Sequence, residues 1–262
     1  MGILNVTPDS FSDGGRFDSR DAALRQAEKM HRDGAAIIDV GGESTRPGAA
    51  AVTASEEIDR VLPIIEALPG VSDLPISIDT SKAAVMREAV RAGAAMINDV
   101  RALRETGALE AAAELGRPVC LMHMQGQPRT MQQDPAYDDV TVEVSSFLEA
   151  RRDACVAAGI PAADIVLDPG FGFGKSAEHN VELLANLRQL SALGQPLLAG
   201  LSRKSTLGAL TGRAVDARLP ASLAAAVIAA LAGANILRVH DVAETVDAMR
   251  IVAAVRDAES KR

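Results

Sequence analysis

Two basic side chains lie close together near the end of the chain, where an apolar run gives way to a polar turn. In the segment ILRVHDVAET, residues 236–245, Arg238 and His240 are two residues apart, and Lys204 follows another apolar run. A guanidinium can bind two oxygens of one anion, and an imidazole can donate a hydrogen bond to a third. This cationic set predicts a local binding site for a phosphate-type group.

A second set of polar side chains also follows apolar runs, and it consists of carboxylates and an amide: Asp79, Asn98 and Asp168. Carboxylates and amides can form hydrogen bonds with the donors and acceptors on the edge of a nitrogen heterocycle, for example an amino-pyrimidinone. Taken alone, an aspartate after a strand is often a helix N-cap, and a histidine there is often structural, so both interpretations stay open. The other polar residues at the ends of apolar runs are Asn5, Asp39, Asp99, His123, Ser202 and Arg203.

The glycine-rich segment GFGFGKS, residues 170–176, resembles a phosphate-binding P-loop but differs from it in spacing. Three residues separate Gly170 from Gly174, where the P-loop motif requires four. Its two aromatic residues, Phe171 and Phe173, belong to a chain with only five Phe, one Tyr and no Trp. We therefore expect these rings to stack on a flat substrate, and packing of the loop on its own rings is the alternative.

Eight apolar runs alternate with stretches that have helical periodicity, and the runs are nearly continuous in apolar residues. That pattern is typical of parallel strands buried on both faces. Eight such units favour a (β/α)8 barrel over a doubly wound sheet, and no linker divides residues 1–262, so we predict an α/β fold of one domain. In such barrels the active site lies at the carboxyl ends of the strands, where the polar sets above fall. The runs are GILNV, AAIIDV, PISID, AAMIND, PVCLMHM, DIVLDPG, PLLAGLS and NILRVHD.

Several helices are specific enough to test. Asp18 or Ser19 is expected to cap the first helix, whose buried face is predicted to hold Ala23, Ala27 and Met30. Ser176 is expected to cap a helix that includes Leu183, Leu184, Leu187 and Leu190.

Charge and cysteine content exclude several functional classes. The formal net charge is −8 at pH 7 and no block of basic residues is present, which argues against general binding of nucleic acids or anionic membranes. Cys120 and Cys155 form neither a CxxC motif nor a disulfide framework, and no signal peptide or membrane-spanning run is evident. These features favour a protein of the cytoplasm.

The motifs resemble those of the dihydropteroate synthase family over essentially the whole chain. That resemblance implies a (β/α)8 barrel that joins p-aminobenzoate to 6-hydroxymethyl-7,8-dihydropterin diphosphate, giving dihydropteroate and pyrophosphate in folate synthesis. Family members usually carry a segment before the first strand, whereas this sequence begins in that strand at Met1. The motifs, in order, are MGILNVTPDSFSDGG, GGESTRPGA, SIDTSK, MINDV, DPGFGFGK, GLSRKST and ILRVHD.

The resemblance also implies roles for individual residues and for a magnesium ion. Catalytic roles would fall to Asp79, Lys204 and Arg46, and the pterin would be bound by Asp79, Asn98, Met122, Asp168 and Lys204. Asn5, Arg238 and His240 would bind the diphosphate, and Asn5 would also contact Mg²⁺. The p-aminobenzoate site would consist of Thr45, Arg46, Phe173, Lys204 and Ser205.

The implied reaction needs no protein nucleophile. Mg²⁺ and the cationic residues offset the charge on departing pyrophosphate, which leaves a pterin-stabilised carbocation near Asp79 for the aryl amine to attack. Ser202 and Cys120 are therefore interpreted as a cap and a small buried residue. Two alternatives stay open: a pterin-binding methyltransferase-type barrel, and a paralogue that binds pterin without turnover. The diphosphate-binding residues argue against the first, and Asn5, Thr45 and Arg46 against the second.

Two expectations concern assembly and loops. The Ala-rich helix near residues 221–233 and the helix VAETVDAMRIV have more apolar surface than one barrel flank needs, and the resembled family is typically dimeric, so we expect a homodimer through this side. The loops that contain Phe11, Thr45 and Arg46 are rich in Gly, Ser, Pro and Asp, so we expect them to become ordered only with diphosphate and Mg²⁺.

Overall fold

The computed structural model describes residues 1–7, 16–44, 51–126 and 130–261, with the side chains of residues 16–19 left out. A strand lies within each of the eight predicted apolar runs. The strands are β1 (Gly2–Asn5), β2 (Ile38–Gly41), β3 (Ile76–Asp79), β4 (Met96–Asp99), β5 (Val119–Met122), β6 (Ile165–Asp168), β7 (Leu198–Ala199) and β8 (Ile236–Leu237).

The strands are parallel and close into a barrel. Pairing runs without interruption from β1 to β6, and β7 pairs with β8. Two single parallel bridges complete the ring: Leu167 with Leu197 joins β6 to the β7 segment, and Gly2 with Val239 joins β1 to the β8 segment. The predicted (β/α)8 barrel is therefore confirmed, with β7 and β8 much shorter than the runs that contain them.

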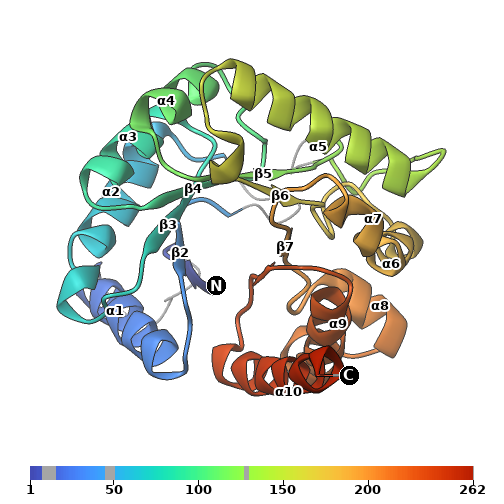
Figure 1. Cartoon of the computed structure of the whole chain (residues 1–262). Helices are drawn as coiled ribbons and strands as arrows, with labels where there is room; N and C mark the ends of the chain where they lie inside the picture. Colours follow the sequence, from blue (N-terminus) through green and yellow to red (C-terminus); the bar gives the residue numbers. More distant parts are fainter. Residues whose placement is uncertain (8–15, 45–50, 127–129, 262) are drawn as a thin grey trace.

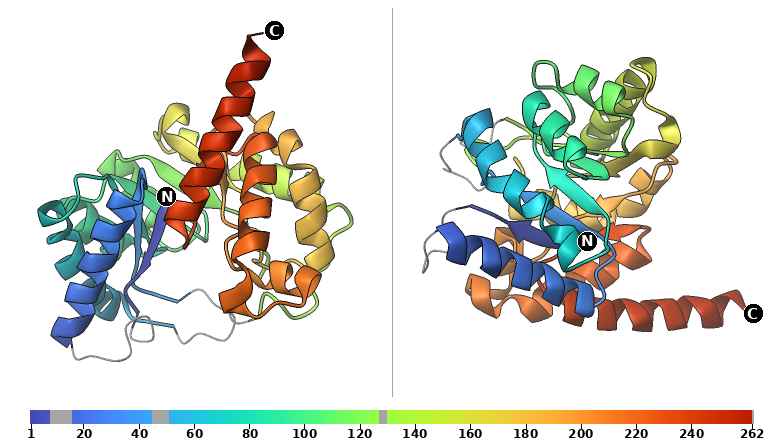
Figure 2. Two further views of the ribbon diagram at one scale, coloured as in Figure 1. Left: turned by 90° about the horizontal axis from the view of Figure 1, so that it is seen from below. Right: turned by 90° about the vertical axis from the view of Figure 1, so that its left-hand side faces the viewer.

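Helices surround the strands on the outside of the ring (Figure 1). The α-helices are α1 (Arg16–Arg32), α2 (Ala54–Ile65), α3 (Ala83–Arg91), α4 (Ala108–Leu115), α5 (Val140–Ala157), α6 (Ala177–Ala185), α7 (Leu187–Ser191), α8 (Ser205–Thr211), α9 (Leu219–Leu231) and α10 (Val242–Ser260). Short 3₁₀ turns are η2 (Leu68–Gly70), η3 (Ala162–Asp164) and η4 (Val215–Ala217). The carboxyl-terminal turns of α10 project beyond the rest of the barrel (Figure 2). None of the helices in the described part of the chain has the length and hydropathy of a membrane-spanning segment.

The helix predictions are confirmed with two exceptions. Ala23, Ala27 and Met30 are buried on one face of α1. Ser176 is the N-cap of α6 and accepts a hydrogen bond from the His179 backbone N–H. The predicted long helix is instead divided at Asn186 into α6 and α7, because a residue outside helical φ/ψ interrupts it there. The prediction that Asp18 or Ser19 caps the first helix is wrong, because α1 begins at Arg16 and both residues lie within it. Their side chains are outside the described ones.

Alternate side chains along each strand pack on opposite faces of the barrel wall. Those in contact with the helices belong to the main core, such as Leu121 on β5 and Leu167 on β6. The alternate residues Met96, Cys120, Val166 and Leu198 form a separate buried cluster with Met1 and Ile236. Because side chains in a strand point to opposite faces with a period of two, this second cluster fills the barrel interior. Most strands are thus apolar on both faces except at their carboxyl ends. The exceptions are Asp39 of β2 and Ser77 of β3, which are buried polar residues at interior positions in register with Met96.

Candidate active site

The carboxyl ends of the strands place polar side chains directly above the apolar cluster in the barrel interior. Asn98 is two residues after Met96, Asp168 two after Val166, and Arg238 two after Ile236. The period of two therefore directs all three side chains to the inside of the barrel. Asp39, Asn98 and Asp168 are buried, and Arg238 is partly buried. The interior is thus apolar at one end and polar at the carboxyl end of the strands, where barrel active sites lie.

Arg238 is the centre of a charged network that joins strands far apart in the sequence. Its Nε donates to Asp39 Oδ2 at 2.6 Å, and its Nη2 donates to Asp79 Oδ2 at 2.8 Å. Asn98 Nδ2 donates to the same Asp39 oxygen at 3.1 Å. Burial opposes the charge of Arg238, but Asp39 and Asp79 outweigh that effect and raise the pKa of Arg238. Burial also raises the pKa of Asp79 to about 7, although Arg238 acts in the opposite direction.

A second carboxylate and a second cation lie on the side of β6 and β7. Asp168 Oδ1 accepts a hydrogen bond of 2.7 Å from the Gly170 backbone N–H. Burial raises the pKa of Asp168, and the nearby Lys204 opposes this rise. Lys204 Nζ donates to the Phe171 carbonyl and lies 4.4 Å from the centroid of the Phe173 ring. Burial lowers the pKa of Lys204 to about 8, with Asp168 acting in the opposite direction.

Asn5 and Asp79 present neighbouring side-chain oxygens above Gly41. A Cβ atom built on Gly41 would lie 3.6 Å from Asn5 Oδ1 and 3.7 Å from Asp79 Oδ2. Gly41 therefore leaves room beside both oxygens. In addition, Asp39 Oδ1 is buried and has no hydrogen-bond partner among the described residues.

These oxygens are chemically suited to Mg²⁺, which prefers oxygen ligands and is usually held by one or two protein groups together with substrate phosphates. No group of three or more His, Cys, Asp or Glu side chains that could enclose a metal ion occurs within the described ranges. The residues present thus fit a metal that arrives with a phosphorylated substrate better than one fixed by the protein alone.

His240 is oriented by Ser202 across the ends of β7 and β8. The Ser202 Oγ lies 3.0 Å from His240 Nδ1 and accepts the His240 backbone N–H at 3.2 Å. Ser202 was expected to be a helix cap, but its hydroxyl instead fixes the ring that sequence reasoning assigned to phosphate. Arg203, the next residue, is not part of this site, because its guanidinium pairs with Asp241, with Nε 3.0 Å from Oδ2.

The two phenylalanines of the glycine-rich loop have different surroundings. Phe171 is 1% exposed and belongs to the main core, so the expectation that it stacks on a substrate is wrong. The Phe173 ring is partly exposed and packs against a cluster formed by Val100, Met122, Met124 and Met131. The loop turns at Gly172, which has φ of +77°, between the two rings. The packing alternative therefore holds for Phe171.

Two residues collected at strand ends have structural roles. Asp99 is fully buried and accepts hydrogen bonds from the Ser81 hydroxyl and, at 2.8 Å each, from the backbone N–H groups of Arg101 and Leu103. His123 packs edge-on against Phe147 at 4.9 Å, and burial lowers its pKa to about 2. Both are out of phase with the inward residues Asn98 and Met122, which explains why they face the surrounding helices and loops.

The remaining predicted residues divide between described and undescribed parts. Met122 and Cys120 are buried, and burial raises the pKa of the Cys120 thiol well above its usual value, which fits an unreactive small residue. Ser205 is exposed at the first position of α8. Thr45, Arg46 and Phe11 lie outside the described residues, as does the side chain of Phe17.

Sequence reasoning missed two buried ionic groups beside this site. Lys82 Nζ lies 2.7 Å from Glu43 Oε2 and 2.5 Å from Glu57 Oε2, and Glu57 is fully buried. Lys175 is 2% exposed, and its ammonium contacts the glycine-rich loop. The available signals were a lysine three residues after the predicted strand PISID and another lysine at the end of a glycine-rich loop, since lysine is seldom buried unless it is paired.

The strands and helices form an α/β barrel with a polar rim inside it at the carboxyl ends of the strands, and comparisons with known proteins specify its class. The family model described as Pterin binding enzyme matches residues 1–240. The dihydropteroate synthase of Escherichia coli strain K12 is 56% identical over 100% of this chain and 93% of that protein. The chain therefore belongs to the pterin-binding enzyme family and, within it, to the dihydropteroate synthases.

Solved structures give the same result. The Xanthomonas albilineans dihydropteroate synthase with 4-aminobenzoic acid has a TM-score of 0.93 and 54% identity, and it covers 98% of this chain and 92% of its own. The same enzyme in complex with 7,8-dihydropteroate has a TM-score of 0.89 and 50% identity, with the same coverage of 98% and 92%. The family membership and the barrel fold that the motifs implied are thus both confirmed.

Proposed function

We propose that the polar rim inside the barrel is where the chain joins p-aminobenzoate to 6-hydroxymethyl-7,8-dihydropterin diphosphate, releasing pyrophosphate. The chain is a transferase, as its membership of the dihydropteroate synthases requires. The observation that supports this location best is the convergence, on one interior rim, of buried carboxylates with two cations from other strands. A flat polar ring and a diphosphate need these two chemistries side by side.

The pterin ring is proposed to bind Asp79, Asn98, Met122, Asp168 and Lys204. The Gly170 N–H fixes one oxygen of Asp168, so the other oxygen can accept hydrogen bonds from ring donors. Asn98 is held by Asp39, which limits the positions that its amide can take. Met122 is apolar and buried at the end of β5, where it can contact the face of a flat ring.

Asn5, Arg238 and His240 are proposed to bind the diphosphate. Arg238 has five N–H donors, and its bonds to Asp39 and Asp79 use two of them. His240 is oriented by Ser202, which reduces the entropy that the imidazole loses on binding an anion.

Mg²⁺ is proposed to contact Asn5, and when bound it would supply positive charge that lowers the energy of the departing pyrophosphate. Arg238 and His240 neutralise charge on the same leaving group from the protein side. The carbon–oxygen bond breaks, and the Asp79 carboxylate, beside the pterin site, favours the positive charge that remains on the pterin. The amine nitrogen of p-aminobenzoate then forms the new carbon–nitrogen bond and releases one proton. No side chain forms a covalent intermediate in this scheme.

p-Aminobenzoate is proposed to bind Thr45, Arg46, Phe173, Lys204 and Ser205. The Phe173 ring is partly exposed beside the Lys204 ammonium, so an aromatic carboxylate could stack on the ring and pair with the cation. Asp79, Lys204 and Arg46 are the residues proposed to act in catalysis.

We further propose that residues 1–262 form one domain that works in the cytoplasm, where two buried free cysteines are compatible with a reducing medium.

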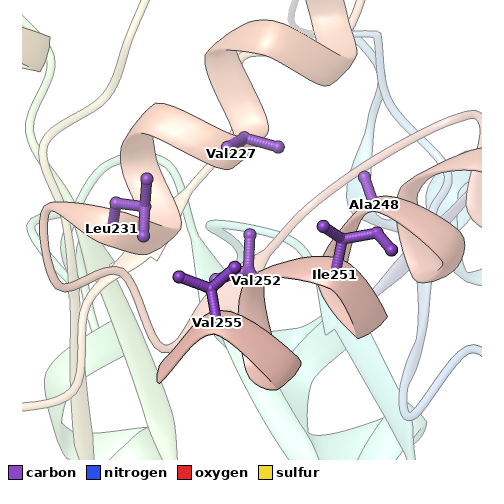
Figure 3. Close-up of a pocket in the computed structure, with 6 residues that line it drawn as sticks. All are labelled: Val227, Leu231, Ala248, Ile251, Val252 and Val255. Atoms are coloured by element: carbon purple, nitrogen blue, oxygen red, sulfur yellow. The ribbon is translucent and has the colours of Figure 1, made fainter. Parts of the chain in front are cut away.

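The assembly is proposed to be a homodimer through α9 and α10. These helices lie side by side and form a groove of about 350 Å³ lined by apolar residues. Figure 3 shows Val227 and Leu231 of α9 facing Ile251, Val252 and Val255 of α10. Ile251 is 68% exposed, and Ile228 and Leu231 are also exposed, so this face has apolar surface that a second copy would cover.

The direct test is release of pyrophosphate from a mixture of pterin diphosphate, p-aminobenzoate and Mg²⁺, with each component omitted in turn. Dihydropteroate and pyrophosphate should form in equal amounts only in the complete mixture. A protein that binds pterin but releases no pyrophosphate would be the binding-only alternative. Dependence on both substrates but not on Mg²⁺ would contradict the magnesium proposal alone.

A further inference from the structure

Lys175 follows the glycine-rich loop, and its buried ammonium forms no ion pair with a carboxylate of the described residues. Nζ lies 2.9 Å from His123 Nδ1, 2.9 Å from the Gly170 carbonyl and 3.1 Å from the Phe173 carbonyl. An ammonium has three N–H donors, so these uncharged acceptors satisfy all of them. Burial lowers the pKa of His123 to about 2, so its ring is neutral and Nδ1 can accept.

Burial lowers the pKa of Lys175 to about 7, so a charge at this position is costly and the presence of a lysine needs a reason other than stability. The loop itself provides one. The Lys175 ammonium donates hydrogen bonds to two carbonyls of the loop, those of Gly170 and Phe173, and to His123 Nδ1. It therefore links the loop to the residue that follows β5. A Cβ atom on Gly170 would lie 1.9 Å from the His123 carbonyl, so the loop rests directly on the backbone after β5.

The shape of this loop determines where two residues of the active site lie. Lys204 Nζ donates to the Phe171 carbonyl and sits over the Phe173 ring. The methylenes of Lys204 pass so close to Gly172 that a Cβ atom there would lie 2.9 Å from Lys204 Cδ. A carbonyl, a ring and a glycine of one loop therefore fix the position of Lys204.

We propose that Lys175 is a positioning residue for the aryl-amine site: it shapes the 170–175 loop so that Phe173 and Lys204 stand ready for p-aminobenzoate. The inference rests on the proposed function, because it assumes that Phe173 contacts that substrate. Lys175 itself touches neither substrate. It acts through the Phe173 carbonyl and, beyond it, through the ring and the Lys204 ammonium.

The test is a double-mutant cycle between Lys175→Met and Phe173→Ala, with pyrophosphate release as the assay. Lys175→Met should raise the KM for p-aminobenzoate at least about fivefold, a typical coupling for residues in contact. The KM for pterin diphosphate should rise by a smaller factor, because Lys204 and Asp168, which contact the same loop, are also proposed to bind the pterin. In the Phe173→Ala background the same substitution should raise the KM for p-aminobenzoate by a clearly smaller factor, because one of the two groups that Lys175 positions, the Phe173 ring, is absent and only Lys204 is left. Equal effects in both backgrounds would overturn the proposal.

The outcomes also separate this inference from the proposed function. If Phe173→Ala alone leaves the KM for p-aminobenzoate unchanged, the assignment of Phe173 to that site fails. If Phe173→Ala raises this KM and Lys175→Met does not, only the inference fails.

A second pair of variants decides the matter if Lys175→Met does not fold. His123→Asn can place an amide oxygen near the position of Nδ1, whereas His123→Leu removes the acceptor. The KM for p-aminobenzoate should rise in His123→Leu and stay close to wild type in His123→Asn. The same KM in both variants would refute the positioning role.

Discussion

Asp168→Asn is the sharpest test of the pterin site, because the structure dictates how the new amide must sit. The Gly170 backbone N–H can only donate, and it donates to Asp168 Oδ1 at 2.7 Å. In the variant, the amide oxygen must take that place, and the NH₂ group must then replace the second carboxylate oxygen. The oxygen that is proposed to accept hydrogen bonds from the pterin is thus replaced by an NH₂ group, which places N–H donors opposite the N–H donors of the ring.

The expected loss follows from this exchange. A hydrogen bond to a charged acceptor contributes roughly 1.5–3 kcal/mol, and the misplaced donor adds the cost of an unsatisfied group, so pterin binding should weaken by on the order of 2–4 kcal/mol. At 1.4 kcal/mol for each factor of ten, that is roughly a 30-fold to 700-fold increase in Kd.

Loss of binding is not expected to come from unfolding. Burial raises the pKa of Asp168 above its ordinary value, so the ionised carboxylate costs stability once the pH exceeds the unfolded-state pKa. The neutral amide does not carry this cost. The Tm of the variant at neutral pH should therefore be similar to that of the wild type or higher.

Isothermal titration calorimetry with a pterin ligand measures the effect, and Asp164→Asn is the matched control. Asp164 lies in η3, immediately before the other end of β6, so its replacement makes the same chemical change far from the rim. Wild-type pterin affinity in Asp168→Asn would refute the assignment of this carboxylate to the ring. Equal losses in both variants would show that the effect is not local.

Three further predictions test other parts of the proposal. Burial lowers the pKa of Lys204 to about 8, so this residue loses its charge as the pH rises through that value. The kcat/KM should fall over the same pH range. Lys204→Arg keeps its charge, so its kcat/KM should show no such decline at alkaline pH. Ile251→Asp should convert a dimer to a monomer in light scattering at unchanged Tm, whereas Val142→Asp, at another exposed apolar position on α5, should not. A wild-type monomer at micromolar concentration would contradict the dimer. p-Aminobenzoate should bind weakly to the free enzyme and markedly more tightly with pyrophosphate and Mg²⁺, and one affinity under both conditions would remove the case for ordered binding.

The sequence was sufficient to predict the strands because each of the eight is a short apolar run. It was also sufficient to predict the polar residues that follow them. It could not show which of Met122 and His123, or of Asn98 and Asp99, faces the barrel interior, because only the register of the strand decides which of two adjacent residues points inward. In the structure, the period of two measured from Cys120 and Met96 sends one member of each pair inward and the other outward.

The loop residues were harder to predict for a related reason. Phe171 and Phe173 have the same spacing from the flanking glycines, and nothing local tells which ring enters the core. The three acceptors of Lys175 lie on the loop itself and on a strand end fifty-two residues away, and the partners of Arg238 lie 199 and 159 residues away. Contacts over such separations follow from barrel closure and leave no periodic signal in the chain.

Barrel closure also explains why this site can hold so many buried charges. The apolar cluster of Met96, Cys120, Val166 and Leu198 excludes water from below the rim, so hydrogen bonds and charges above it act in a medium of low dielectric constant. In that medium an isolated charge is costly, and the fold meets the cost by pairing Arg238 with Asp39 and Asp79 before any substrate arrives. Those pairs hold the side chains in place. If Arg238 binds the diphosphate as proposed, little reorganisation is needed when charge develops on the leaving group, so the pairs that stabilise the unliganded rim would also prepare it for catalysis.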